Sequence, residues 1–207
     1  MSGTVIFLNG TSSAGKTTLA LALQELMPEP YQHVALDQFR DGMPARYRGL
    51  NSPAGTTGQR GLNVVPVTQP NGEAFTEVRF GEDGERLLRG MRRAMATMAA
   101  EGINIIIDDI ILSPAFLDDY LEVMAGTRLY FVGVRCPLEV IAAREAARPG
   151  RFPGTAESHF ELCHAHGEYD IEVDTSAATP AACAGAVIAR IDAGSPLAFS
   201  RLRTPAG

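Results

Sequence analysis

Lysine is almost absent from this sequence. The chain has 207 residues and 18 lysines and arginines together, but Lys16 is the only lysine. Arginine fills the other basic positions, so residue 16 needs something that arginine does not supply. A lysine ammonium is a compact charge on a flexible stem, whereas a guanidinium is a planar fork. Lys16 is therefore the first candidate functional residue.

Long apolar runs and a positive charge excess are also lacking. No stretch approaches the eighteen or so apolar residues of a membrane span. The net charge is −6, which argues against a polyanionic partner such as nucleic acid. An apolar strand pattern begins close to residue 4, without a basic leader before it. These features predict a protein that binds neither membrane nor nucleic acid.

Cysteines are few and are not spaced in pairs. The three are Cys136, Cys163 and Cys183, an odd number that does not suggest a disulfide framework. Reduced thiols are typical of the cytosol, so we expect a cytoplasmic protein.

Lys16 lies in a segment that fits the phosphate-binding loop Gly-x-x-x-x-Gly-Lys-[Ser/Thr] in full. An apolar run over 5–8 precedes it and a helical pattern over 19–26 follows, which is the strand–loop–helix context that the motif requires. Backbone N–H groups of such a loop point at a phosphate, and the hydroxyl of Thr17 is a ligand for Mg²⁺. The segment predicts binding of a nucleoside triphosphate through Gly10, Thr11, Ser12, Ser13, Ala14, Gly15, Lys16, Thr17 and Thr18.

Strand and helix patterns alternate along most of the chain. We expect strands at 5–9, 33–37, 103–108, 129–134 and 171–173, with a helix ending at Gly102 and others starting at Ser113-Pro114 and Thr179-Pro180. Short strands separated by helices form parallel sheets covered on both faces. The pattern predicts one α/β domain over residues 1–193.

Two regions interrupt the alternation. Residues 48–81 are rich in Gly, Pro, Asn and Thr, and Asn71-Gly72 lies between two apolar stretches. This pattern predicts a hairpin or an irregular excursion, which we interpret as the acceptor-binding segment. The tail over 194–207 has no periodicity, and we expect it to be loose or to dock on a neighbour.

Three carboxylates are candidates for chemistry. Asp108 and Asp109 end an apolar strand, and a carboxylate at that place beside a phosphate loop typically holds Mg²⁺. Neighbouring residues of a strand point to opposite faces, so only one of the two is expected to face the metal, and the spacing does not say which. Asp37 is expected at the end of the second strand, where it faces the same crevice. It is either the base that removes a proton from an attacking hydroxyl or a helix N-cap.

Arginines gather after the fourth expected strand. Arg144, Arg148 and Arg151 surround a Pro-Gly break, and the segment 144–155 reads either as a lid that neutralises phosphoryl charge or as a solvated helix face.

Taken together, the phosphate loop, Asp37, the Asp108-Asp109 pair and the arginine segment resemble the chloramphenicol phosphotransferase family. Further matches lie at 8–10, 26–30, 105–109, 132–136, His164 and 168–175. The resemblance implies a P-loop kinase fold, a three-layer α/β/α sandwich with a five-stranded parallel sheet of order 2-3-1-4-5 and a helical lid. It also implies ATP and Mg²⁺ as cofactors, Asp37 as general base and a lid formed by the arginines, but gives no chemistry for His164.

The chain departs from the family between Asp37 and Asp108, where the segment is longer than in the chloramphenicol enzyme. The acceptor is expected to bind there, so the resemblance implies the reaction class but not the substrate. The leading hypothesis is transfer of the γ-phosphoryl of ATP to a hydroxyl of an antibiotic-like small molecule, in resistance or biosynthesis.

Two alternatives stay open. One is a kinase of a nucleoside, a sugar nucleotide or another metabolite on the same scaffold. The other is a nucleotide-driven switch without a small acceptor, although a chain with one lysine cannot contain the guanine-reading Asn-Lys-x-Asp motif. The sequence leaves a homo-oligomer open as well.

Overall fold

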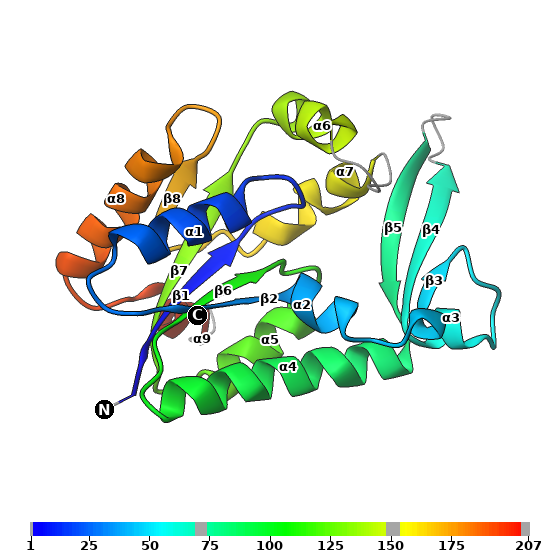
Figure 1. The fold of residues 1–207 in the computed structure, drawn as a ribbon, viewed down its shortest axis with the longest axis horizontal. Helices are drawn as coiled ribbons and strands as arrows, with labels where there is room; N and C mark the ends of the chain where they lie inside the picture. The colour runs from blue at the N-terminus through cyan, green and yellow to red at the C-terminus, as the bar shows by residue number, and fades with distance from the viewer. Residues whose placement is uncertain (1, 69–73, 148–153, 204–207) are drawn as a thin grey trace.

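A five-stranded parallel sheet forms the centre of the computed structural model, which describes residues 2–68, 74–147 and 154–203 (Figure 1). Its strands lie in the order β2-β6-β1-β7-β8, which is 2-3-1-4-5 when these five are numbered along the chain. Their bounds are β1 (Thr4–Asn9), β2 (Gln32–Ala35), β6 (Ile105–Asp109), β7 (Arg128–Arg135) and β8 (Ile171–Asp174). All five strands therefore direct their carboxyl ends to one edge of the sheet.

Helices cover both faces of this sheet, and strand alternation divides the core between them. Phe7, Ile107 and Phe131 pack on the face covered by α4 (Glu82–Ala100), α5 (Pro114–Val123) and α9 (Ala198–Arg203). Leu8 and Val132 pack on the other face, which is covered by α1 (Lys16–Leu26), α6 (Leu138–Ala146), α7 (Thr155–Phe160) and α8 (Pro180–Asp192). The result is the predicted α/β/α sandwich.

The predicted helix boundaries at Gly102, Ser113 and Thr179 are confirmed. Gly102 follows α4 with φ of 86°, a left-handed conformation that favours glycine. The Ser113 and Thr179 hydroxyls accept hydrogen bonds from the third residues of α5 and α8, each of which has proline in its first turn. Among the described residues, no helix combines the length and hydropathy that crossing a bilayer requires.

A second, smaller sheet lies at one end of the molecule (Figure 1). It consists of β3 (Arg48–Leu50), β4 (Leu62–Thr68) and β5 (Ala74–Phe80), in that order. The antiparallel pairing of β4 with β5 confirms the predicted hairpin, while its Asn71-Gly72 turn falls outside the described residues. The sequence did not predict β3, which pairs parallel with β4 and is connected to it through α3 (Thr57–Arg60).

One expectation needs correction, and one open alternative is decided. Asp37 does not end a strand: β2 stops at Ala35 and Asp37 lies in the first turn of α2 (Leu36–Asp41), because the Gln38 side chain accepts a hydrogen bond from the Ala35 N–H (3.0 Å) and caps the helix there. For the tail, docking is the alternative that holds over residues 198–203, because α9 packs on the sheet. Phe199 of α9 is 5% exposed, and its ring centroid lies 5.1 Å from that of Phe131.

A buried polar cluster anchors the end of β1 just before the phosphate loop. The Asn9 amide donates to the carbonyl of Cys163 (2.6 Å) and to the Tyr169 hydroxyl (2.6 Å). His164, in the 3₁₀ turn η2 (Leu162–His164), contacts the same hydroxyl, and His166 stacks on a core aromatic ring. Burial and then the Arg135 charge lower the pKa of His164 to about 4 and lower that of His166.

The docking of α9 predicts a measurable loss of stability when its aromatic anchor is removed. Phe199→Ala should lower the free energy of unfolding by about 3 kcal/mol, because truncating a buried phenylalanine leaves a cavity. Chemical denaturation of the two proteins measures this difference. Leu197→Ala is the control, because Leu197 is 48% exposed. Equal unfolding midpoints for Phe199→Ala and wild type would show that α9 does not contribute.

The histidine cluster predicts loss of stability in mild acid. The folded pKa of His164 lies below the unfolded value of about 6.5, so the unfolded chain binds the proton more readily. The free energy of unfolding should therefore fall as pH drops from about 6.5 to about 4. Denaturation across this range should show a shallower fall for His164→Gln than for wild type, whereas identical slopes would contradict the assignment.

Candidate active site

The phosphate loop joins β1 to α1 at the carboxyl edge of the large sheet. A Cβ on Gly10 would lie 2.5 Å from the Val134 carbonyl oxygen, so only glycine fits against β7. Ser13 and Gly15 have φ of 62° and 97°, left-handed values that turn the loop back toward α1. The Lys16 ammonium donates to the carbonyls of Gly10 (2.9 Å) and Thr11 (3.1 Å) and is thus enclosed by the loop. The predicted loop residues therefore form one continuous turn around the Lys16 ammonium.

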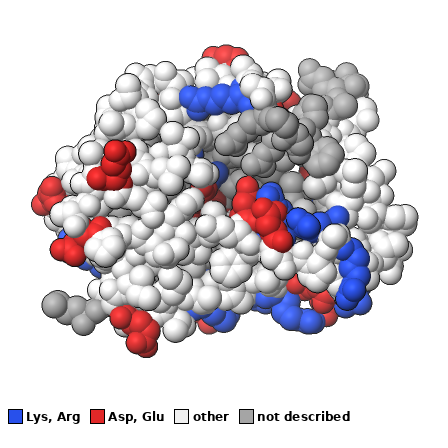
Figure 2. All heavy atoms as spheres, in the orientation of Figure 1, with Lys and Arg blue, Asp and Glu red and all other residues white. Residues whose placement is uncertain are grey.

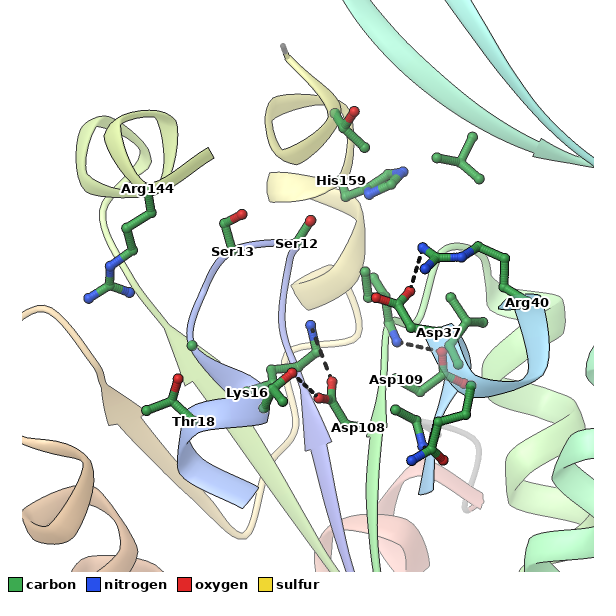
Figure 3. Close-up of a pocket in the computed structure, with 18 of the residues that line it drawn as sticks. Ser12, Ser13, Lys16, Thr18, Asp37, Arg40, Asp108, Asp109, Arg144 and His159 are labelled. Atoms are coloured by element: carbon green, nitrogen blue, oxygen red, sulfur yellow. Dashed lines mark hydrogen bonds and ion pairs between the residues drawn. The ribbon is translucent and has the colours of Figure 1, made fainter. Parts of the chain in front are cut away.

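Oxygen donors suited to a divalent cation lie beside this lysine. The Thr17 hydroxyl donates to Asp108 Oδ2 (2.7 Å), and Lys16 Nζ lies 3.7 Å from Asp108 Oδ1 (Figure 3). Burial alone would raise the pKa of Asp108, but the Lys16 charge and the contacts with His33 and Thr17 outweigh it and lower the pKa. An ionised carboxylate beside a hydroxyl fits Mg²⁺, which prefers hard oxygen ligands.

Asp109 lies on the other side of the same strand. Its carboxylate accepts hydrogen bonds from the Tyr120 hydroxyl and the Ile110 N–H (2.7 Å), and it is 2% exposed. Burial raises its pKa. Asp109 also borders the cavity, but of the two predicted carboxylates only Asp108 contacts Thr17 and Lys16 among the described residues.

A cavity of about 1130 Å³ extends from the phosphate loop to the small sheet. Figure 2 shows a hollow near the middle of the face, with charged side chains of both signs beside it. The lining brings together the loop, β6, α2, α7 and the small sheet, and includes Ser12, Lys16, Asp37, Asp108, His159 and Val78. Groups more than 100 residues apart in sequence therefore face one space.

Asp37 enters this cavity from α2. Its Oδ1 atom lies 2.8 Å from the Arg40 guanidinium, one helical turn away, and its side chain is 45% exposed (Figure 3). Arg40 also pairs with Asp41 at 2.9 Å. A carboxylate that is paired with Arg40, yet accessible from the cavity, can accept a proton from a bound hydroxyl.

Arg144 packs against the loop and is not a solvated helix residue. Its guanidinium donates to the Thr175 hydroxyl (3.0 Å) and carbonyl (2.9 Å), and the Thr175 hydroxyl donates to the carbonyl of Ala14 (2.6 Å). Arg144 thereby joins α6, the phosphate loop and the segment after β8. Arg148 and Arg151 lie outside the described residues, so the lid itself stays a prediction.

The sequence did not identify several residues that border the cavity. They are His33, Arg40 and the apolar side chains of the small sheet. His33 is the first residue of the expected strand at 33–37, so the pattern placed it away from the carboxyl edge where Asp37 was expected. His159 of α7 also borders the cavity.

Comparison with known proteins agrees with this geometry. The family described as chloramphenicol phosphotransferase-like protein matches residues 3–192. A protein of Mycobacterium tuberculosis named "Putative O-phosphotransferase" is 34% identical over 209 residues, which cover 97% of this chain and 88% of that protein.

Solved structures of kinases share the fold. The Mycobacterium tuberculosis APS kinase CysC, in complex with AMPPNP and APS, has a TM-score of 0.63 at 15% identity and covers 92% of this chain and 98% of its own. A gluconokinase from Sinorhizobium meliloti has a TM-score of 0.59 at 20% identity and covers 97% of this chain and 95% of its own. The chain has the fold of P-loop kinases and belongs to the chloramphenicol phosphotransferase-like family.

Proposed function

We propose that this protein is an ATP-dependent O-phosphotransferase that transfers the γ-phosphoryl group of ATP to a hydroxyl of an antibiotic-like small molecule. One observation carries the proposal: a single cavity contains the phosphate loop, the Thr17–Asp108 pair and the Asp37 carboxylate. The cavity can therefore hold a phosphate donor and an acceptor at the same time.

The position of each residue in the cavity indicates its role in the transfer. The loop N–H groups and Lys16 bind the phosphates of ATP and offset the negative charge that develops on the transferred group. Thr17 and Asp108 would hold Mg²⁺, which would neutralise charge on the phosphate oxygens. Arg144 keeps the loop against the segment after β8 and so acts as a positioning residue.

Asp37 is the proposed base of the transfer. The acceptor O–H proton moves to the Asp37 carboxylate while the acceptor oxygen bonds to the γ-phosphorus, and the bond from that phosphorus to ADP breaks. The ion pair with Arg40 holds the carboxylate in place. ADP and a phosphate monoester of the acceptor are the products.

The direct test is to incubate the protein with Mg·ATP and a panel of hydroxylated antibiotics, chloramphenicol included, together with nucleosides. Mass spectrometry should reveal a phosphate adduct on an antibiotic-like compound. An adduct on nucleosides only would support the metabolite-kinase alternative instead. Absence of any adduct across the panel would count against an antibiotic-like acceptor.

Replacing the proposed base should slow transfer without preventing nucleotide binding. Asp37→Asn should reduce turnover by about 10²–10⁴-fold, because an amide cannot take the hydroxyl proton. The dissociation constant for Mg·AMPPNP, measured by calorimetry, should stay within about twofold. Asp118→Asn on the exposed side of α5 is the control. Undiminished turnover in Asp37→Asn would remove this residue from the base role.

Removing the Thr17 hydroxyl should weaken the use of Mg²⁺. Thr17→Ala should raise the Mg²⁺ concentration needed for half-maximal turnover by about tenfold or more, because the cation loses an oxygen ligand. A magnesium titration at saturating ATP measures the shift, with Thr97→Ala on the exposed side of α4 as control. An unchanged half-maximal concentration would show that Thr17 does not hold the cation.

A further inference from the structure

His159 occupies a fixed position between the phosphate loop and the small sheet. It lies on α7, whose Ala156 carbonyl accepts a hydrogen bond from the Thr11 hydroxyl of the loop (2.8 Å). On the other side, the Ser158 hydroxyl donates to the Thr76 carbonyl of β5 (3.0 Å). The Glu145 carboxylate accepts from the Ala156 N–H (3.1 Å) and secures the start of the helix. The imidazole is thus held where a donor phosphate and an acceptor would meet.

The imidazole of His159 has unused hydrogen-bonding capacity. The residue is 6% exposed, borders the cavity and has a buried Nδ1 atom without a hydrogen-bond partner among the described residues (Figure 3). Burial, and then the Lys16 charge, lower its pKa to about 4, so the ring is neutral at pH 7. A neutral imidazole offers one donor and one acceptor, and a buried polar atom that is left unpaired is destabilising.

An apolar wall borders the same cavity. In the β4–β5 ladder Leu62 lies opposite Phe80 and Val64 lies opposite Val78, and all four side chains border the cavity. Residues two apart on a strand share a face, so these two cross-strand pairs form one surface. This wall suits an apolar group of the acceptor.

The charged side chains on this side of the cavity are already paired. Arg40 contacts Asp37 (2.8 Å) and Asp41 (2.9 Å), and Arg48 lies 3.6 Å from Asp41. Within the described ranges, both arginines that border the cavity beside the small sheet therefore have carboxylate partners. An anionic acceptor would have to displace these carboxylates, whereas an uncharged one would not.

We propose that His159 is a specificity-determining residue that hydrogen-bonds a second polar group of an uncharged, amphipathic alcohol, whose apolar part lies on the wall of Leu62, Val64, Val78 and Phe80. The inference rests on the proposed function, because it places the acceptor hydroxyl at Asp37. It adds that the acceptor carries two polar groups beside an apolar body and no phosphate.

Histidine ring NMR tests this placement without requiring turnover. The chain has four histidines, so the ring signals of ¹⁵N-labelled protein can be assigned with His159→Gln. The probes are chloramphenicol, an uncharged diol with an aromatic ring, uncharged adenosine and anionic AMP, each added to protein saturated with Mg·AMPPNP. We expect chloramphenicol to shift the His159 signals and AMP to leave them unchanged. A larger shift with AMP, or no shift with either uncharged probe, would overturn the proposal.

Kinetics separate binding at His159 from a structural effect. For the panel compound that is phosphorylated, His159→Phe should raise the acceptor KM about tenfold or more. The kcat and the KM for ATP should stay within about threefold of wild type. His159→Gln, which keeps a hydrogen-bonding group, should restore part of the affinity for the acceptor. His164→Gln is the control, because His164 is a partly buried, neutral histidine that does not border the cavity. Equal acceptor KM values in wild type and His159→Phe would contradict the proposal.

The two proposals can fail separately. A shift of the His159 signals by an uncharged probe, without phosphoryl transfer to any compound, would support the binding site and count against the kinase activity. Transfer to a compound whose binding leaves the His159 signals unchanged would support the kinase and overturn the role of His159.

Discussion

The enclosure of one ammonium group by the phosphate loop is the constraint on which the rest of the site depends. Lys16 Nζ is held by the carbonyls of Gly10 and Thr11 and lies 3.7 Å from Asp108. This arrangement needs β1 and β7 close enough that residue 10 has no side chain, and β6 beside β1 so that Asp108 reaches Thr17. The strand order brings these three strands together at one edge.

The cavity extends this edge toward the small sheet. Helix α1 provides Lys16 and strand β6 provides Asp108, while α2 provides Asp37 and α7 provides His159. Helix α7 contacts both the loop, through Thr11, and β5, through Thr76. One short helix therefore connects the phosphate loop to the small sheet, and in the proposed function these are the donor and acceptor ends of the cavity.

Sequence reasoning predicted most of the fold because apolar strands and capped helices leave strong local patterns. It missed β3, since the three residues Arg48–Leu50 are too short to show alternation, and α9, since six residues span fewer than two turns. It also ended β2 too late, because the cap on α2 comes from the side chain of Gln38. Helix preference at that point depends on a local hydrogen bond that apolar periodicity does not reveal.

The site was predictable where a motif defines it and not where tertiary contacts do. The loop and the Asp108-Asp109 pair could be read directly, but only the positions of Thr17 and Tyr120 distinguish the two carboxylates. His159 gave no usable signal, because a single histidine on a short helix does not reveal which cavity it borders.

The most direct measurement is the ratio of ADP to phosphate monoester formed from γ-labelled ATP, with and without the hydroxylated panel. A kinase in which Asp37 activates an acceptor hydroxyl predicts one phosphate monoester for each ADP, and little ADP when the panel is omitted. ADP released at the same rate without any acceptor, with free phosphate as the other product, would contradict this account and indicate a nucleotide-driven switch.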